Sequence, residues 1–191
     1  MDASDTYEKI LDAATRVVNK IGFAKTTIEA IAEEAMLSKG GVFYYFKTKD
    51  DCLLAILDRI FERILIDARA NYAQLPPGPG RMLKAYITAW IKWNLPPRNV
   101  QIKGLLDNDA LRERLIDWRV QHYELVLDGQ IPELVVQKVL LICSGLWTTP
   151  LLARATMEEL RAFFEVMQGE MLAMIDDAAL DMPGNEERSW A

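Results

Sequence analysis

The 191-residue chain is poor in the side chains that build disulfides and metal centres, with only two cysteines and one histidine. Cys52 and Cys143 lie far apart in apolar surroundings, so we expect two buried thiols and a reducing, cytoplasmic location. The sequence also lacks a glycine-rich phosphate loop, a cluster of histidine and carboxylates, and a serine or cysteine near a base. We therefore expect no enzyme, no metal and no cofactor.

Long apolar runs are also missing. None approaches the roughly 20 residues that cross a bilayer, so we expect no membrane span. The first ten residues, MDASDTYEKI, are polar and acidic, and we expect no secretory signal peptide. Hydrophobic residues make up 51% of the chain and charged residues 26%, as in ordinary soluble globular proteins. The net charge of -6 argues against a nucleic-acid partner for the chain as a whole.

That charge is unevenly distributed. Residues 1–50 hold seven Lys and Arg against eight Asp and Glu, so most of the net charge lies in the remainder. Lys39, Lys47 and Lys49 fall together in this first part, while most of its acids lie elsewhere. The overall charge is therefore a poor guide to what the first fifty residues bind.

Apolar residues recur at the spacing of amphipathic helices in the first part of the chain. A first helix includes residues 10–21, and Gly22 ends it. Thr26 and Glu29 have the Thr-x-x-Glu form of a capping box, which predicts the start of a second helix. Ser38 is placed to cap a short third helix.

The rest of the chain is also predicted to be helical, and no alternating strand pattern interrupts it. Thr48 and Asp51 repeat the capping pattern at the start of a long fourth helix that reaches about Tyr72. The segment LPPGPGR, residues 75–81, breaks the helical pattern. Further helices are predicted at about residues 82–94, in two stretches between 98 and 127, at 133–154, and from Thr156 onward. The expected fold is all-α, with about nine helices.

The stretch LSKGGVFYYFKTKDD, residues 37–51, follows the second helix and contains the short third one. A helical wheel places one set of side chains where it would pack on the first two helices: Val42, Tyr45 and Phe46. The opposite side and its flanks hold Gly40, Phe43, Tyr44, Lys39 and Gly41. Two helices joined by a tight turn form a helix-turn-helix, whose second helix enters the DNA major groove. From the residues alone, DNA contact and a purely structural aromatic helix both remain open.

The segment TTIEAIAEEAMLSKGGVFYYFKTKDDCLLAIL, residues 26–57, resembles the N-terminal domain of the TetR family of bacterial transcriptional regulators. The resemblance covers nearly all of residues 6–57 and rests on Gly22-Phe23, Thr27, Ile31-Ala32, Ser38-Lys39-Gly40, Tyr45-Phe46 and Lys49. It implies a homodimeric repressor that binds a palindromic operator and is released by a small apolar or aromatic inducer. The implied division is a helix-turn-helix DNA-binding domain at 1–50, a ligand-binding and dimerisation domain at 51–180, and a flexible tail at 181–191.

The resemblance also implies which residues meet double-stranded DNA: Thr27, Ser38, Lys39, Gly40, Gly41, Phe43, Tyr44 and Lys49. Thr27 and Lys49 would bind phosphates. Two positions depart from the family pattern. Phe43 stands where tyrosine is usual, which removes a phenolic phosphate contact. Met36 replaces the usual glycine of the turn, where a left-handed conformation costs on the order of 1 kcal/mol.

Two aromatic stripes in the later helices are candidates for contacts with a ligand. One helix presents Tyr86, Trp90 and Trp93, and another presents Trp118 and His122. Such stripes are usually core, but a ligand-controlled regulator needs a cavity lined by apolar and aromatic groups. Both interpretations remain open.

The last two helices are predicted to form the homodimer interface. The residues chosen for it are small or apolar: Cys143, Gly145, Leu160, Phe164, Met167 and Met171. The family resemblance implies the same, since its members pair these helices in a four-helix bundle. Packing within one chain is the alternative explanation of the same stripe. A second function also stays open, that of a helical small-molecule-binding protein with weakened or lost DNA binding.

Overall fold

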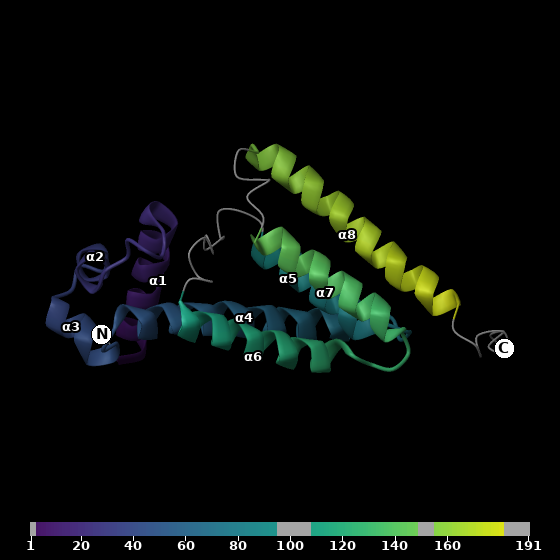
Figure 1. Cartoon of the computed structure of the whole chain (residues 1–191), viewed down its shortest axis with the longest axis horizontal. Coiled ribbons are helices and arrows are strands. Elements are labelled where there is room, and N and C mark those ends of the chain that lie inside the picture. The colour runs from purple at the N-terminus through teal and green to yellow at the C-terminus, as the bar shows by residue number, and fades with distance from the viewer. Residues whose placement is uncertain (1–2, 95–107, 149–154, 182–191) are drawn as a thin grey trace. The chain divides into compact units, whose positions relative to one another are not determined.

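The structure, a computed structural model, describes residues 3–94, 108–148 and 155–181, and its regular structure there is entirely helical (Figure 1). This confirms the predicted all-α fold. Eight helices lie in the described residues: α1 Ala3–Ile21, α2 Ile28–Glu34, α3 Lys39–Tyr45, α4 Lys49–Gln74, α5 Arg81–Asn94, α6 Asp109–Val126, α7 Glu133–Thr148 and α8 Met157–Leu180. The helix predicted before α6, the last residues predicted for α7 and most of the predicted tail fall outside the described residues.

The helices divide into two compact units. The first unit contains the described residues up to Glu62 and those from 108 to Trp118, which include α1, α2 and α3. The second unit contains residues 63–94, 119–148 and 155–181, which include α5, α7 and α8. Helices α4 and α6 each contribute residues to both units. The first unit therefore extends beyond residue 50, because the start of α4 packs with the N-terminal helices.

The first unit is built on the apolar face of α1. Its buried residues recur at helical spacing and are Ile10, Leu11, Ala13, Ala14, Val17 and Val18. Helix α2 packs on α1, and α3 packs on α2 (Figure 1). Gly22 has a φ of 80° and follows the last residue of α1, as the sequence predicts for a helix-ending glycine. Burial of the α1 face thus fixes the platform on which α2 and α3 rest.

The helix caps agree with the sequence except at α2. Thr48 and Asp51 cap the start of α4 reciprocally, with N···O distances of 2.8 and 3.1 Å, and Thr156 and Glu159 form the predicted capping box of α8. At α2 the predicted cap is wrong by one residue. Thr27, not Thr26, accepts the N–H of Ala30 at 3.1 Å. Thr26 is buried, and its hydroxyl instead donates to the Gly22 carbonyl at 2.9 Å.

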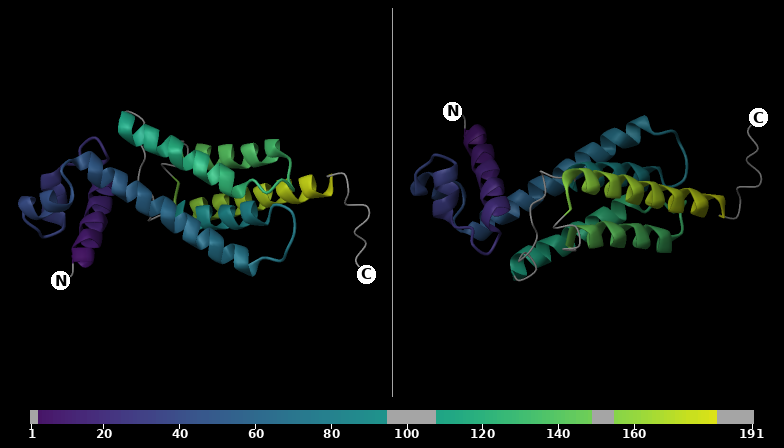
Figure 2. Two further views of the ribbon diagram at one scale, coloured as in Figure 1. Left: turned by 90° about the horizontal axis from the view of Figure 1, so that it is seen from below. Right: turned by 90° about the horizontal axis from the view of Figure 1, so that it is seen from above.

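In the second unit, α5, α7 and α8 pack against one another, as the views in Figure 2 show. The predicted break before α5 ends at Gly80, which has a φ of 66°. A Cβ at this position would lie 2.5 Å from Cγ2 of Ile175 on α8 and 3.0 Å from Cγ1 of Ile131. Glycine is therefore required here for both backbone conformation and space. Among the helices described, none is long and apolar enough to cross a membrane.

Candidate functional site

The turn between α2 and α3 closes through two backbone hydrogen bonds. The N–H of Met36 donates to the Glu33 carbonyl at 3.0 Å, and that of Leu37 donates to the Ala32 carbonyl at 2.9 Å. This pairing is a Schellman motif, which places Met36 in the left-handed conformation with a φ of 53°. Its side chain is 82% exposed. The chain thus keeps the tight turn of a helix-turn-helix without the glycine that makes such a turn easy.

Helix α3 is held to the first unit by one side only. Val42 and Phe46 are buried, and Tyr45 is half-buried. The ring of Tyr7 on α1 lies 5.2 Å from that of Phe46 and 6.2 Å from that of Tyr45, measured between centroids. Ser38 caps the helix by accepting the Gly41 N–H at 3.0 Å. These contacts confirm the predicted inward side of α3.

The other side of α3 faces solvent. Tyr44 is 76% exposed, and its ring meets that of Tyr45 edge-on with centroids 5.1 Å apart. Gly40 is exposed too, and a Cβ there would meet only Ser38 Oγ, at an ordinary 3.9 Å. Gly41 and Phe43 are half-buried. Packing within the protein therefore does not require glycine at position 40, and the surface beside it is open to another molecule.

The three lysines around α3 have different partners. Lys39 forms an ion pair with Glu29 of α2, and its ammonium lies 5.4 Å from the centroid of the Phe43 ring. Lys47 donates to the Phe43 carbonyl at 2.9 Å, while Lys49 Nζ lies 3.5 Å from the Ala24 carbonyl.

Glu29 is a residue that the sequence analysis missed as part of this surface. The hydrogen bond from Lys39 contributes most to lowering the pKa of its carboxyl, and a backbone hydrogen bond lowers it further. The sequence signal was weak, because Glu29 and Lys39 belong to different helices and their pairing depends on how α2 and α3 pack.

Three of the predicted ligand residues are buried in the second unit: Tyr86 and Trp90 on α5 and His122 on α6. The Tyr86 hydroxyl lies 2.8 Å from His122 Nδ1, and the two rings meet edge-on. Burial lowers the pKa of His122 to about 4 and raises the pKa of Tyr86. Both side chains are therefore neutral near pH 7. The Trp90 ring lies 6.4 Å from the Phe164 ring on α8.

The other two predicted ligand residues are bound to aspartates of α4. The indole N–H of Trp93 donates to Asp67 at 2.7 Å, within the second unit. The indole N–H of Trp118 donates to Asp58 at 2.8 Å, and this pair belongs to the first unit. Neither aspartate was identified from the sequence. The five predicted residues are thus divided between the two units, because Trp118 contacts Asp58 and Phe61 on the part of α4 that belongs to the first unit.

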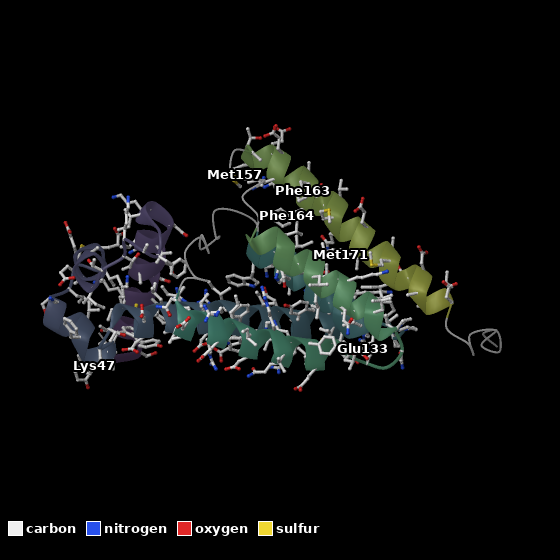
Figure 3. All side chains as sticks on the ribbon, viewed as in Figure 1. Lys47, Glu133, Met157, Phe163, Phe164 and Met171 are labelled. Atoms are coloured by element: carbon white, nitrogen blue, oxygen red, sulfur yellow. The ribbon has the colours of Figure 1, made fainter. Side chains whose placement is uncertain are left out.

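Three residues predicted at the dimer interface lie inside their own chain. Cys143, Phe164 and Met171 are buried, and Cys143 Sγ lies 3.9 Å from Met171 Sδ. Figure 3 labels Phe164 and Met171 on α8, on the side toward the other helices of the unit. Packing of α8 on α5 and α7 already covers these three within one chain. Gly145 is exposed, and Leu160 and Met167 are half-buried.

Other apolar residues of α7 and α8 are exposed. On α7, Leu134 and Leu141 are seven residues apart, and Leu141 is 70% exposed. On α8, Val166 is 59% exposed, and further exposed small or apolar residues recur at intervals of three or four: Ala162, Gly169 and Ala173. These exposed residues lie on the side of α8 opposite to the predicted stripe, which carries the larger side chains.

Part of the sequence matches known proteins. Residues 10–56 match the family model for bacterial regulatory proteins of the tetR family. The HTH-type transcriptional regulator TtgR of Pseudomonas putida is 30% identical over 129 residues, which cover 66% of this chain and 61% of TtgR. The match thus spans less than two thirds of this relative's length.

Solved structures share the fold over most of their length. The fatty acid degradation regulator FadR from Bacillus halodurans has a TM-score of 0.74 and 18% identity, covering 90% of this chain and 97% of FadR. The multidrug binding protein EbrR complexed with malachite green has a TM-score of 0.63 and 22% identity, covering 88% and 97%.

In the described residues, the structure contains no group of three or more His, Cys, Asp or Glu that could hold a metal ion. The capped, tightly turned pair of α2 and α3 lies within the residues that the family model matches. Residues 10–56 therefore form an N-terminal domain of the tetR family of bacterial regulatory proteins.

Proposed function

We propose that this protein is a ligand-responsive transcriptional repressor that binds a palindromic operator through α3. The proposal rests on one observation, that one side of α3 is buried and the other is exposed. Val42 and Phe46 anchor one side in the core, while Gly40 and Tyr44 leave the other open. A helix held in this way can enter a major groove, with its glycine edge close to the duplex.

Phosphate anchors would flank this helix. Thr27 caps α2, and Lys49 begins α4 with its ammonium near a neutral carbonyl. Such side chains position a protein on the duplex through phosphates, whereas sequence is read at base edges. With glycine at positions 40 and 41, Tyr44 and Lys39 of α3 and Ser38 at its cap would be left to reach the bases.

The repressor would act as a homodimer. Two recognition helices that fit successive major grooves must lie about 34 Å apart, which requires a two-fold partner. The exposed apolar surface of α7 and α8, represented by Leu141 and Val166, offers such a partner a self-complementary face. Exposed small residues such as Gly169 and Ala173 would allow close helix packing at its centre.

The inducer would bind in the second unit, beside the aromatic residues of α5. EbrR, which shares this fold, is a multidrug binding protein complexed with malachite green. Tyr86 and His122 would offer neutral polar groups among apolar ones, which suits a small apolar or aromatic ligand with few charges. Since α4 contributes to both units, a ligand that favours one conformation of α4 would shift the dimer away from operator binding.

The alternative function, a helical small-molecule-binding protein without DNA binding, is motivated by Phe43 in place of a tyrosine. One experiment separates the two. A band-shift assay would use the duplex upstream of the chain's own gene, with a mixed-sequence duplex as competitor. The regulator should shift the upstream duplex in the presence of excess competitor. Equal binding to both duplexes, or to neither, would contradict an operator-binding repressor.

A further inference from the structure

The positive charge of Lys39, the only lysine of α3, is balanced by a carboxylate in the DNA-free protein. Lys39 is paired with Glu29 across the α2–α3 surface, and both side chains are exposed. The Glu29 carboxyl is ionised near pH 7, and the hydrogen bond from Lys39 holds its pKa below the ordinary value. A phosphate that approaches Lys39 therefore meets a carboxylate already bound to the same ammonium.

The other two lysines of this surface have uncharged partners. Lys47 and Lys49 lie against the carbonyls of Phe43 and Ala24, which carry no net charge. Transfer of either ammonium to a phosphate leaves no uncompensated charge behind. Transfer of Lys39 leaves Glu29 ionised close to the phosphate, which opposes the contact.

We infer that Glu29 competes with DNA phosphate for Lys39 and thereby weakens binding to duplexes of the wrong sequence. This inference rests on the proposed function. On a random duplex, Lys39 gains little by leaving Glu29 for a phosphate. At the operator, Lys39 can meet a guanine edge, or remain on Glu29 while other contacts supply the affinity. Glu29 is therefore a specificity-determining residue on a helix other than the recognition helix.

Salt dependence distinguishes the two kinds of lysine. A cation that neutralises one phosphate releases about 0.9 counterions from B-DNA. In the parent protein, Lys39 remains paired with Glu29 on a random duplex, so it neutralises no phosphate and releases no counterion. Lys39 should therefore add little to the slope of log K against log salt in the parent protein. In a Glu29→Gln variant it should contribute fully, and the slope of the dimer should steepen by roughly two.

The test measures binding of Glu29→Gln to a mixed-sequence duplex by fluorescence anisotropy over a series of salt concentrations. Glu33→Gln is the matched control, since Glu33 is an exposed carboxylate on the same helix and the charge change is identical. We expect Glu29→Gln to raise affinity roughly two- to fivefold per subunit beyond the control, and to steepen the salt slope. Equal effects of the two variants would mean that only long-range charge matters, and would overturn the inference.

A double-variant comparison gives an independent check. Lys39→Gln should hardly change the salt slope in the parent, but should lower it by roughly two in the Glu29→Gln background. Additive effects in the two backgrounds would also overturn the inference. Thermal unfolding followed by circular dichroism establishes that each variant is folded.

Failure of the proposed function gives a different result. If neither Lys49→Ala nor any other of these variants changes duplex binding, the surface does not bind DNA. If Lys49→Ala weakens binding while Glu29→Gln behaves like Glu33→Gln, only the role of Glu29 is wrong.

Discussion

The hydroxyl of Tyr86 and Nδ1 of His122 lie 2.8 Å apart in the interior of the second unit. Burial lowers the pKa of His122 from its ordinary 6.5 to about 4, so the folded protein holds a neutral imidazole at this contact. A buried neutral histidine makes folding sensitive to mild acid, because the unfolded chain can protonate the ring more easily than the folded protein can.

The stability of the protein should therefore fall as the pH decreases from about 6.5 to about 4. In this range the unfolded chain binds a proton at His122 that the folded protein does not, which can cost up to about 3 kcal/mol at the acid end. Urea unfolding across this range measures the loss. His122→Gln should be less stable than the parent near pH 7 but should lose less stability on acidification. Parallel pH dependence of the two proteins would contradict a buried neutral histidine.

The strained turn offers a stabilising substitution. Met36→Gly should stabilise the protein by about 1 kcal/mol, because glycine adopts a φ of 53° without the Cβ clash and the exposed methionine packs on little. For a chain of this size the melting temperature should rise by roughly 2–4 °C. Met36→Ala keeps a Cβ and should not give this gain. A destabilised glycine variant would show that the methionine side chain contributes more than its exposure implies.

Lys49→Ala should weaken binding to every duplex. A dimer that loses two phosphate contacts should lower the slope of log K against log salt by roughly two. Arg69→Ala is the control, because it removes the same charge from an exposed position on α4 in the second unit. Anisotropy titrations at several salt concentrations give both slopes. The role of Lys49 as a phosphate anchor is wrong if the two variants have the same slope.

Gly40→Val should abolish operator binding while the domain stays folded. A Cβ at this exposed position meets only Ser38 Oγ, at 3.9 Å, so the free energy of unfolding should change by no more than about 1 kcal/mol. The added bulk would keep α3 from approaching the duplex. Gly40→Ala provides a smaller step and should weaken binding less. Unchanged affinity in a band-shift assay with Gly40→Val would mean that this edge of α3 does not enter the groove.

Val166→Glu and Leu141→Glu should give monomers in analytical ultracentrifugation, because each places a charge at an exposed apolar residue of the helices proposed to pair. Ile66→Glu is the matched control on α4, where the isoleucine is 57% exposed. Phe164→Glu is unsuitable as an interface test, since Phe164 is buried and the charge would disrupt the fold of one chain. A dimer that survives both interface substitutions would place the contact elsewhere.

The sequence by itself determined the helices and the orientation of α3. Caps such as Ser38 with Gly41, Thr48 with Asp51 and Thr156 with Glu159 join residues three apart, so their chemistry can be recognised without tertiary information. The inward side of α3 likewise follows from helical spacing. At α2 even this local rule failed, because two adjacent threonines could each cap the helix. Burial of Thr26 against Gly22 decided between them.

Only the tertiary structure decided the contacts between helices. The pairing of Lys39 with Glu29, and of the indoles with Asp58 and Asp67, depends on how separate helices pack, which no local spacing encodes. The apolar stripe of α8 was ambiguous for a related reason. The hydrophobic effect is non-directional and favours burial by any apolar surface, so sequence cannot distinguish a partner chain from the chain's own helices. Packing of α5 and α7 against Phe164 and Met171 made that distinction.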